Sequence, residues 1–288
     1  MKRIVALLCS FVVTVAATAA DDKIPTPEKL KEQAADVIKK TDLKDGNIQE
    51  TENLIFVSSL PESKAKAMAD SLQKIFTSAS NALKFERASD QREAKWSIYL
   101  FADIDVFRQY GRSVLKERLE TDQVVVSNIK ADAPKIAVSV KRGEKNPNFE
   151  VLAGTEIAGG LLQKKAGNAR LTEWMKDGFT RTLMMRNDPK IGASDRALVK
   201  KIAPALPKGA KATWVIDKAW SGMGKEKDAV AASVMEFFVY GAGFPKLSGI
   251  FSGLTPEGNN EPTFVTALAA GEIKLDDLDR EWREWVQK

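Results

Sequence analysis

The order of apolar and polar positions predicts strands mixed with helices in the first half of the chain. Apolar runs rich in β-branched and aromatic residues predict strands at residues 52–61 and 95–103. Between them, apolar residues at spacings of three and four predict a helix over residues 61–85. The pattern continues with a predicted helix over 105–120 and strand candidates at 122–130 and 135–143.

From Asn148 onward the pattern is almost entirely helical. Gly- and Pro-rich stretches at 187–194, 203–211 and 255–262 are expected to be loops between helices. The predicted fold class is therefore α+β. It has a mixed β-sheet with helices in the N-terminal half, a mostly helical C-terminal half and a cleft between them. The expected boundaries are an upper α/β subdomain over 51–168 and a lower helical subdomain over 169–288.

The N-terminal residues predict a leader rather than part of the core. Residues 1–20 carry two cations, an apolar run and then small residues, which is the layout of a signal peptide. Residues 21–50 are polar with one amphipathic helical stretch, and an exposed leader is expected there. The protein is therefore expected to be exported, to the periplasm or the cell exterior. The apolar run is too short for an ordinary membrane span, and no span is expected after cleavage.

The composition removes several kinds of chemistry. The 288 residues contain no histidine, and the single cysteine, Cys9, lies inside the predicted signal peptide. This excludes a histidine-containing catalytic triad, and in the mature chain it also excludes a cysteine nucleophile and zinc sites with nitrogen and sulfur ligands. The net charge is +5, but lysines are interleaved with acids. Binding to nucleic acid is therefore not expected, and nothing in the sequence indicates the oligomeric state.

Two predicted helices carry the candidate site. In the first, over 149–165, Thr155 and Gly159 share one face, because they are one turn apart. Its glycines, Gly154, Gly159 and Gly160, would each cost about 1 kcal/mol relative to alanine, which suggests close backbone packing or an inherited motif. The second helix begins at Thr172 and carries Asp177 beside an apolar stripe. Helical spacing predicts that the tryptophans of the second half belong to the core rather than to a sugar-binding surface: Trp174, Trp282 and Trp285.

These segments resemble the gluzincin-type zinc metallopeptidases, whose active site reads His-Glu-x-x-His followed by Trp-x-x-Glu-Gly-x-Ala. The matching stretches here are TEIAG, at 155–159, and WMKDGFT, at 174–180. The apolar helix with its Tyr-Gly turn, 231–254, and the ending at 267–288 are also similar to that family. The resemblance covers residues 51–288 and implies a zincin-like fold.

The resemblance also implies that the metal chemistry has been lost. Thr155 and Gly159 stand where the family has its two histidine ligands, and Asp177 replaces the third ligand, a glutamate. Only Glu156, at the position of the general base, is unchanged. A base without a metal-activated water cannot run the peptidase reaction, so neither zinc nor another metal cofactor is expected.

The expected function is that of an exported, catalytically inactive peptidase-like protein, which binds a peptide or protein partner in the former substrate cleft. In the active family an edge strand before the first ligand helix pairs with the substrate backbone. The segment in that place predicts strand addition along Ile136, Ala137, Val138, Ser139 and Val140. Two alternatives stay open: a hydrolase or hard-cation site using Glu156 and Asp177, with Glu173 as a further carboxylate, or a purely structural envelope protein.

Overall fold

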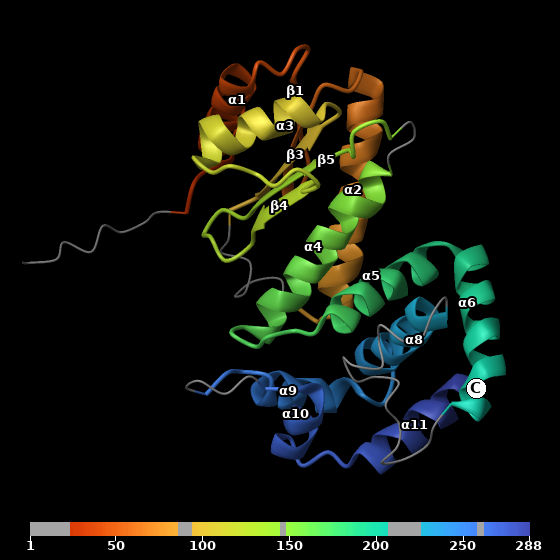
Figure 1. The fold of residues 1–288 in the computed structure, drawn as a ribbon. Helices are drawn as coiled ribbons and strands as arrows, with labels where there is room; N and C mark the ends of the chain where they lie inside the picture. The colour runs from red at the N-terminus through yellow and green to blue at the C-terminus, as the bar shows by residue number, and fades with distance from the viewer. Residues whose placement is uncertain (1–23, 86–93, 145–147, 207–225, 258–261) are drawn as a thin grey trace, which may run out of the picture.

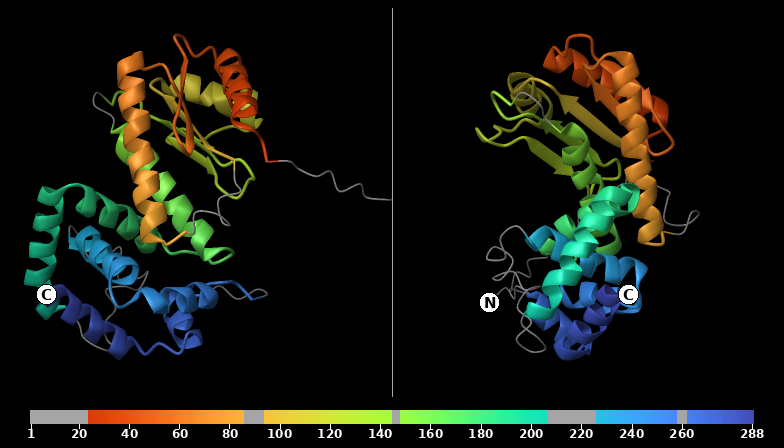
Figure 2. Two further views of the ribbon diagram at one scale, coloured as in Figure 1. Left: turned by 180° about the vertical axis from the view of Figure 1, so that it is seen from behind. Right: turned by 90° about the vertical axis from the view of Figure 1, so that its right-hand side faces the viewer.

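The computed structural model describes residues 24–85, 94–144, 148–206, 226–257 and 262–288. It shows an α+β fold in which a sheet-containing part lies against a helical part (Figure 1). Both further views show the two parts stacked, with α4 near the junction (Figure 2). The predicted signal peptide, residues 1–20, lies outside the described residues. Among the described helices, none combines the length and apolar character needed to cross a membrane.

A single mixed sheet of five strands forms the centre of the first part, in the order β1-β2-β3-β5-β4. Strands β2, β3 and β5 run parallel, and β1 and β4 pair antiparallel at its two ends. Every residue of β2 and β3 is buried, as expected for strands covered on both faces. The bounds are β1 Asn47–Glu50, β2 Leu54–Ser58, β3 Trp96–Phe101, β4 Val125–Asn128 and β5 Lys135–Ser139.

One face of the sheet is covered by the segment that the sequence pattern assigns to an exposed leader. Helix α1, Pro27–Thr41, buries Leu30, Ala34 and Val37 in a cluster with sheet residues such as Tyr99. The prediction of an exposed leader is therefore wrong for this helix, whose apolar stripe packs on the sheet. Strand β1 also belongs to the sheet, although its sequence, NIQE, is too polar for the apolar pattern to indicate a strand.

Helix α3, Ile104–Tyr110, covers the same face and is shorter than the predicted helix over 105–120. It continues as one π-helical segment, η1 Gly111–Leu115, and ends where Lys116 adopts a left-handed backbone with φ of 63°. A Cβ atom on Gly111 would lie 2.6 Å from Cγ of Leu119. The chain after Lys116 therefore folds back against the helix, and the helix ends earlier than predicted.

The opposite face of the sheet is covered by α2, Glu62–Ala82, and α4, Phe149–Ala166. Their apolar side chains join a core that runs without interruption into the helical part, from Trp96 of the sheet to Trp282 of the last helix. Trp174 and Trp282 are buried, which confirms their predicted place in the core. Trp285 is only half-buried and packs at the edge of the core.

The helical part surrounds α8, in which every residue from Ala229 to Val239 is buried. Helix α6 begins inside the stretch 187–194, so the prediction of a loop there is wrong. The side chain of Asp188 accepts hydrogen bonds from the backbone of Lys190 and Ile191, and Pro189 suits the first helical position. The bounds are α5 Glu173–Asn187, α6 Pro189–Ile202, 3-10 segment η2 Ala203–Ala205, α8 Lys227–Tyr240, α9 Phe244–Gly253, α10 Phe264–Ala270 and α11 Leu275–Gln287.

Candidate functional site

Helix α4 carries most of the predicted site and connects the two parts of the molecule. The side chain of Asn148 caps it by accepting a hydrogen bond of 3.1 Å from the backbone nitrogen of Val151. Different sides of the helix contact α2, the sheet and α5. Only the side that faces none of these elements is open to solvent.

The three glycines of α4 differ in how closely neighbouring residues pack against them. A Cβ atom on Gly154 would lie 2.7 Å from Cδ1 of Ile75, and one on Gly160 would lie 2.8 Å from Cδ1 of Ile129. Close packing therefore accounts for these two glycines. At Gly159 the nearest atom would be Cβ of Lys176, at 3.8 Å, which is an ordinary contact. A Cβ atom therefore fits at this position.

Thr155 and Glu156 are both half-buried. The hydroxyl of Thr155 donates a hydrogen bond of 2.8 Å to the carbonyl of Val151 in its own helix. Glu156 lies about 100° further around the helix. Within the described residues, the Glu156 side chain makes no hydrogen bond or ion pair.

Asp177 lies on α5, next to Lys176, which contacts Gly159. The carboxyl group is half-buried, and this burial raises its pKa. The negative charges of Glu173 and Asp228 raise the pKa further, while nearby lysines oppose the change. The acidic charges that act on Asp177 therefore come from its own helix and from α8. In the described parts of the chain, no group of three or more His, Cys, Asp or Glu residues could hold a metal ion.

Strand β5 does not have the free edge that strand addition requires. It pairs parallel with β3 on one side and antiparallel with β4 on the other. Residues Ile136, Ala137, Val138, Ser139 and Val140 are all buried. The prediction that a peptide adds along these residues is therefore wrong, because both edges of the strand already pair within the sheet.

The terminal strand on this side of the sheet is β4. The backbone nitrogen of Ser139 donates to the carbonyl of Val124, at 2.7 Å, which sets the alternation of the antiparallel pair. Val125 and Ser127 are then the positions whose backbone N–H and C=O groups point away from β5. The outer edge of β4 has no strand partner among the described residues.

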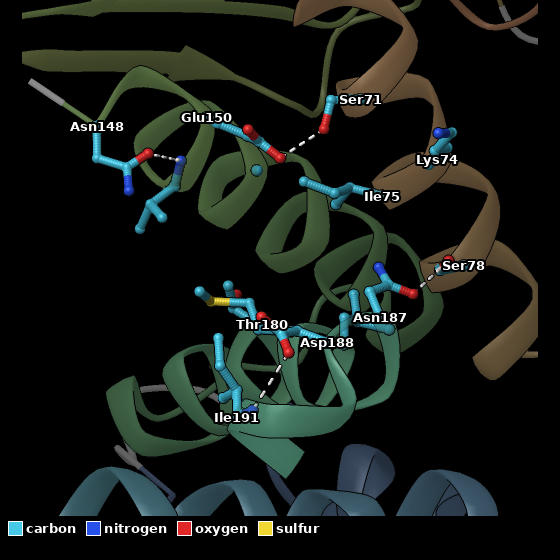
Figure 3. Close-up of a pocket in the computed structure, with 14 residues that line it drawn as sticks. Ser71, Lys74, Ile75, Ser78, Asn148, Glu150, Thr180, Asn187, Asp188 and Ile191 are labelled. Carbon is cyan, nitrogen blue, oxygen red and sulfur yellow. Dashed lines mark hydrogen bonds between the residues drawn. The ribbon is translucent and has the colours of Figure 1, made fainter.

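A pocket of about 560 Å³ lies between α2, α4, α5 and α6. Figure 3 shows Glu150 and Ser71 on one side of it and Thr180, Asp188 and Ile191 on the other. The hydroxyl of Ser71 donates to Glu150 and joins α2 to α4, and Asp188 caps α6. These polar groups therefore already have structural partners. None of the predicted residues Thr155, Glu156, Gly159 and Asp177 lines this pocket.

The sequence pattern missed the buried carboxylates of the helical part. Glu236 of α8 is paired with Arg186 and Arg196, and Asp195 of α6 with Arg181. The signal at Glu236 is a single acid inside the apolar run AASVMEFFVY. A lone acid in such a run indicates a buried and paired carboxylate, since an unpaired one would be too costly to bury.

Comparison with known proteins adds no relative: no family model matches the chain, and no curated protein matches it. The resemblance to the zinc metallopeptidases therefore depends on the residues of the two helices and on the order of the elements around them.

Proposed function

We propose that the protein is an exported, catalytically inactive metallopeptidase-like protein of zincin-like fold, which binds a peptide or protein segment by strand addition at the free edge of β4. The observation that carries this proposal is the outward direction of the backbone groups of Val125 and Ser127. Ser127 is exposed, so an added strand reaches its backbone without displacing a buried side chain.

The contact between α4 and α5 supports the zincin-like part of the proposal. Gly159, at the second ligand position, faces the stem of Lys176, the residue immediately before Asp177. The three ligand positions are therefore on two packed helices, next to a mixed sheet whose terminal strand, β4, is antiparallel. The packed pair of helices fits the resemblance, whereas the strand just before α4, β5, is interior rather than the edge strand that the resemblance implies.

Catalytic inactivity follows from the side chains at those positions. Gly159 has no ligand atom, and the hydroxyl of Thr155 is already bonded within its helix. Without a bound metal, neither the attacking water nor the peptide carbonyl is activated in the way the peptidase reaction needs. The alternative hydrolase has less support, because no hydrogen bond or ion pair of the described residues positions the Glu156 carboxylate.

The test of strand addition replaces one outward backbone N–H by proline. Peptides selected from a random library on the wild-type protein are titrated calorimetrically against Ser127→Pro. We expect affinity to fall by about tenfold or more, since an outward main-chain bond is lost and the added strand is disturbed. Proline is tolerated on an edge strand where its nitrogen faces solvent, so the melting temperature should change little.

The matched control is Ile48→Pro in β1, at the opposite edge of the sheet, where the register also directs the backbone N–H outward. This variant should bind the selected peptides as the wild type does. The proposal fails if no peptide is selected, or if Ser127→Pro binds as tightly as the wild type.

The zincin-like arrangement has a separate test. A triple variant, Thr155→His with Gly159→His and Asp177→Glu, restores the ligand set that the related peptidases use. We expect it to bind one zinc ion per chain, measured by mass spectrometry of metal content. The control is Leu152→His with Glu156→His, a pair with the same spacing whose centre lies about 60° further around α4. Equal zinc affinity in both would contradict the arrangement and leave strand addition at β4 untouched.

A further inference from the structure

A second pocket, of about 490 Å³, lies in the helical part between the end of α5, α6, α8 and α11. It shares no residue with the free edge of β4 or with the predicted residues of α4. Its polar lining is dominated by cations, and its apolar lining includes the half-buried ring of Trp285. The residues that matter here are Arg186, Arg196, Lys200, Glu236, Trp285 and Lys288.

The buried carboxylate of Glu236 holds two arginines at this pocket. Nη2 of Arg196 donates to Oε1 of Glu236 at 2.7 Å, and Nε of Arg186 lies 2.8 Å from the same oxygen. The Glu236 side chain is only 4% exposed, whereas those of Arg186 and Arg196 are 39% and 48% exposed. The guanidinium group of Arg186 also lies over the ring of Tyr240, 4.1 Å from its centre. Both guanidinium groups are therefore oriented by the protein while remaining accessible.

One carboxylate does not use all the donors of two arginines. Each guanidinium group has five N–H donors in a fixed plane. Within the described residues, both Nη atoms of Arg186 and Nη1 of Arg196 donate no hydrogen bond. Lys200 and Lys288 likewise form no ion pair with the described residues. Counting side chains alone, the lining has four cations and one acid, which leaves a positive excess.

We propose that this pocket binds a small ligand that carries a carboxylate or phosphate group beside an aromatic or apolar body. The oxyanion bridges the free donors of Arg186 and Arg196, since a guanidinium group pairs with such oxygens through two parallel hydrogen bonds. The body packs on Trp285 and Val286. The volume lies within the usual range for small-molecule sites, and their lining typically combines an apolar wall with a few fixed polar groups.

The experiment titrates the full mature chain with phenyl phosphate, benzoate and benzyl alcohol, with calorimetric detection. We expect one site per chain for at least one of the two anions and none for the neutral alcohol. Tighter binding of phenyl phosphate identifies the oxyanion as a phosphate, and equal or tighter binding of benzoate identifies it as a carboxylate. Binding of the alcohol as tightly as of the anions would overturn the proposal.

The variants keep the fold while removing the donors. Arg196→Gln leaves Glu236 paired with Arg186, and its affinity for the anion should fall by about tenfold, as expected for a lost charged hydrogen bond. Lys200→Gln does not touch Glu236 and should weaken binding by about threefold, through the lost charge alone. Lys201→Gln, an exposed neighbour that does not line the pocket, is the control for general attraction of anions to a basic protein. Unchanged affinity in both Arg196→Gln and Lys200→Gln, or an equal loss in Lys201→Gln, would overturn the proposal.

Discussion

In the sheet-containing part, the buried polar side chains of the described residues are all hydroxyls, whereas the helical part also buries three carboxylates. The carboxylates are Asp195, Glu236 and Asp279, and each lies against at least one arginine. A sheet joins its strands through the backbone, so its side chains need no charge to set their register. Helices satisfy their backbone internally. In the helical part, arginine pairs connect α5, α6 and α8 in addition to apolar packing.

The largest expected effect is on the charged network of the helical part. Arg186→Ala combined with Arg196→Ala leaves Glu236 buried and unpaired, which should lower the free energy of unfolding by about 3–5 kcal/mol. Adding Glu236→Leu should recover most of that loss, because the uncompensated charge is gone. Urea denaturation of the wild type, the double variant and the triple variant measures the three free energies of unfolding.

The matched change in the sheet-containing part is Ser139→Ala. Its hydroxyl donates a hydrogen bond of 3.0 Å to the carbonyl of Phe101, and its loss should cost only about 1 kcal/mol. If this variant loses as much stability as the double arginine variant, the contrast between the two parts is wrong.

The next effect is the change in stability when a glycine at a helix contact is replaced by alanine, compared between the α5–α8 contact and the α4–α5 contact. A Cβ atom on Gly178 would lie 2.6 Å from the carbonyl oxygen of Ala231, so Gly178→Ala should destabilise the contact of α5 with α8 by about 1–3 kcal/mol. Gly159→Ala, at the junction with the sheet-containing part, meets only an ordinary contact and should stabilise the protein by up to about 1 kcal/mol. Thermal unfolding compares the two, and a loss in Gly159→Ala would show that α4 and α5 pack as tightly there as α5 and α8.

The smallest effect is on Asp177 and depends on pH. Because burial and neighbouring acids raise its pKa in the folded state, the ionised carboxyl weakens the fold above that pKa. Asp177→Asn should therefore raise the melting temperature slightly at pH 7. The gain should disappear as pH falls below about 3.9, the usual pKa of an unfolded aspartate, since the carboxyl is then protonated in both states.

The control for this pH dependence is Asp70→Asn, at an exposed position of α2 in the sheet-containing part, which should change little at either pH. A gain at Asp177 that persists at low pH would indicate that the substitution acts through packing rather than through charge.

The elements with a strong apolar pattern were predictable, and those decided by one or two polar residues were not. The apolar runs of β2 and β3 and the helical spacing of α2 and α4 are confirmed, because burial on a sheet or a helix face requires those periods. Strand β1 has no such pattern. The start of α6 depends on the cap at Asp188. The proline and glycine of the stretch 187–194 are typical of a turn, so the pattern without the cap predicts a loop. In the candidate site, the positions of Thr155 and Gly159 on one helix were predictable, but their environment was not.

The sequence by itself determined the α+β class, the mixed order of strands and helices, the helix that carries Thr155 and Gly159, and the absence of histidine that removes zinc chemistry of the usual kind. Among the described residues, the tertiary structure decided that β5 is an interior strand and β4 a terminal one, and that the charges of Glu173 and Asp228 act on Asp177. It also decided that Glu236 gathers two arginines at one pocket. The reason is physical: periodicity records which side of an element is buried, whereas strand order and charge pairing depend on residues far apart in the chain, which only the packing of elements brings together.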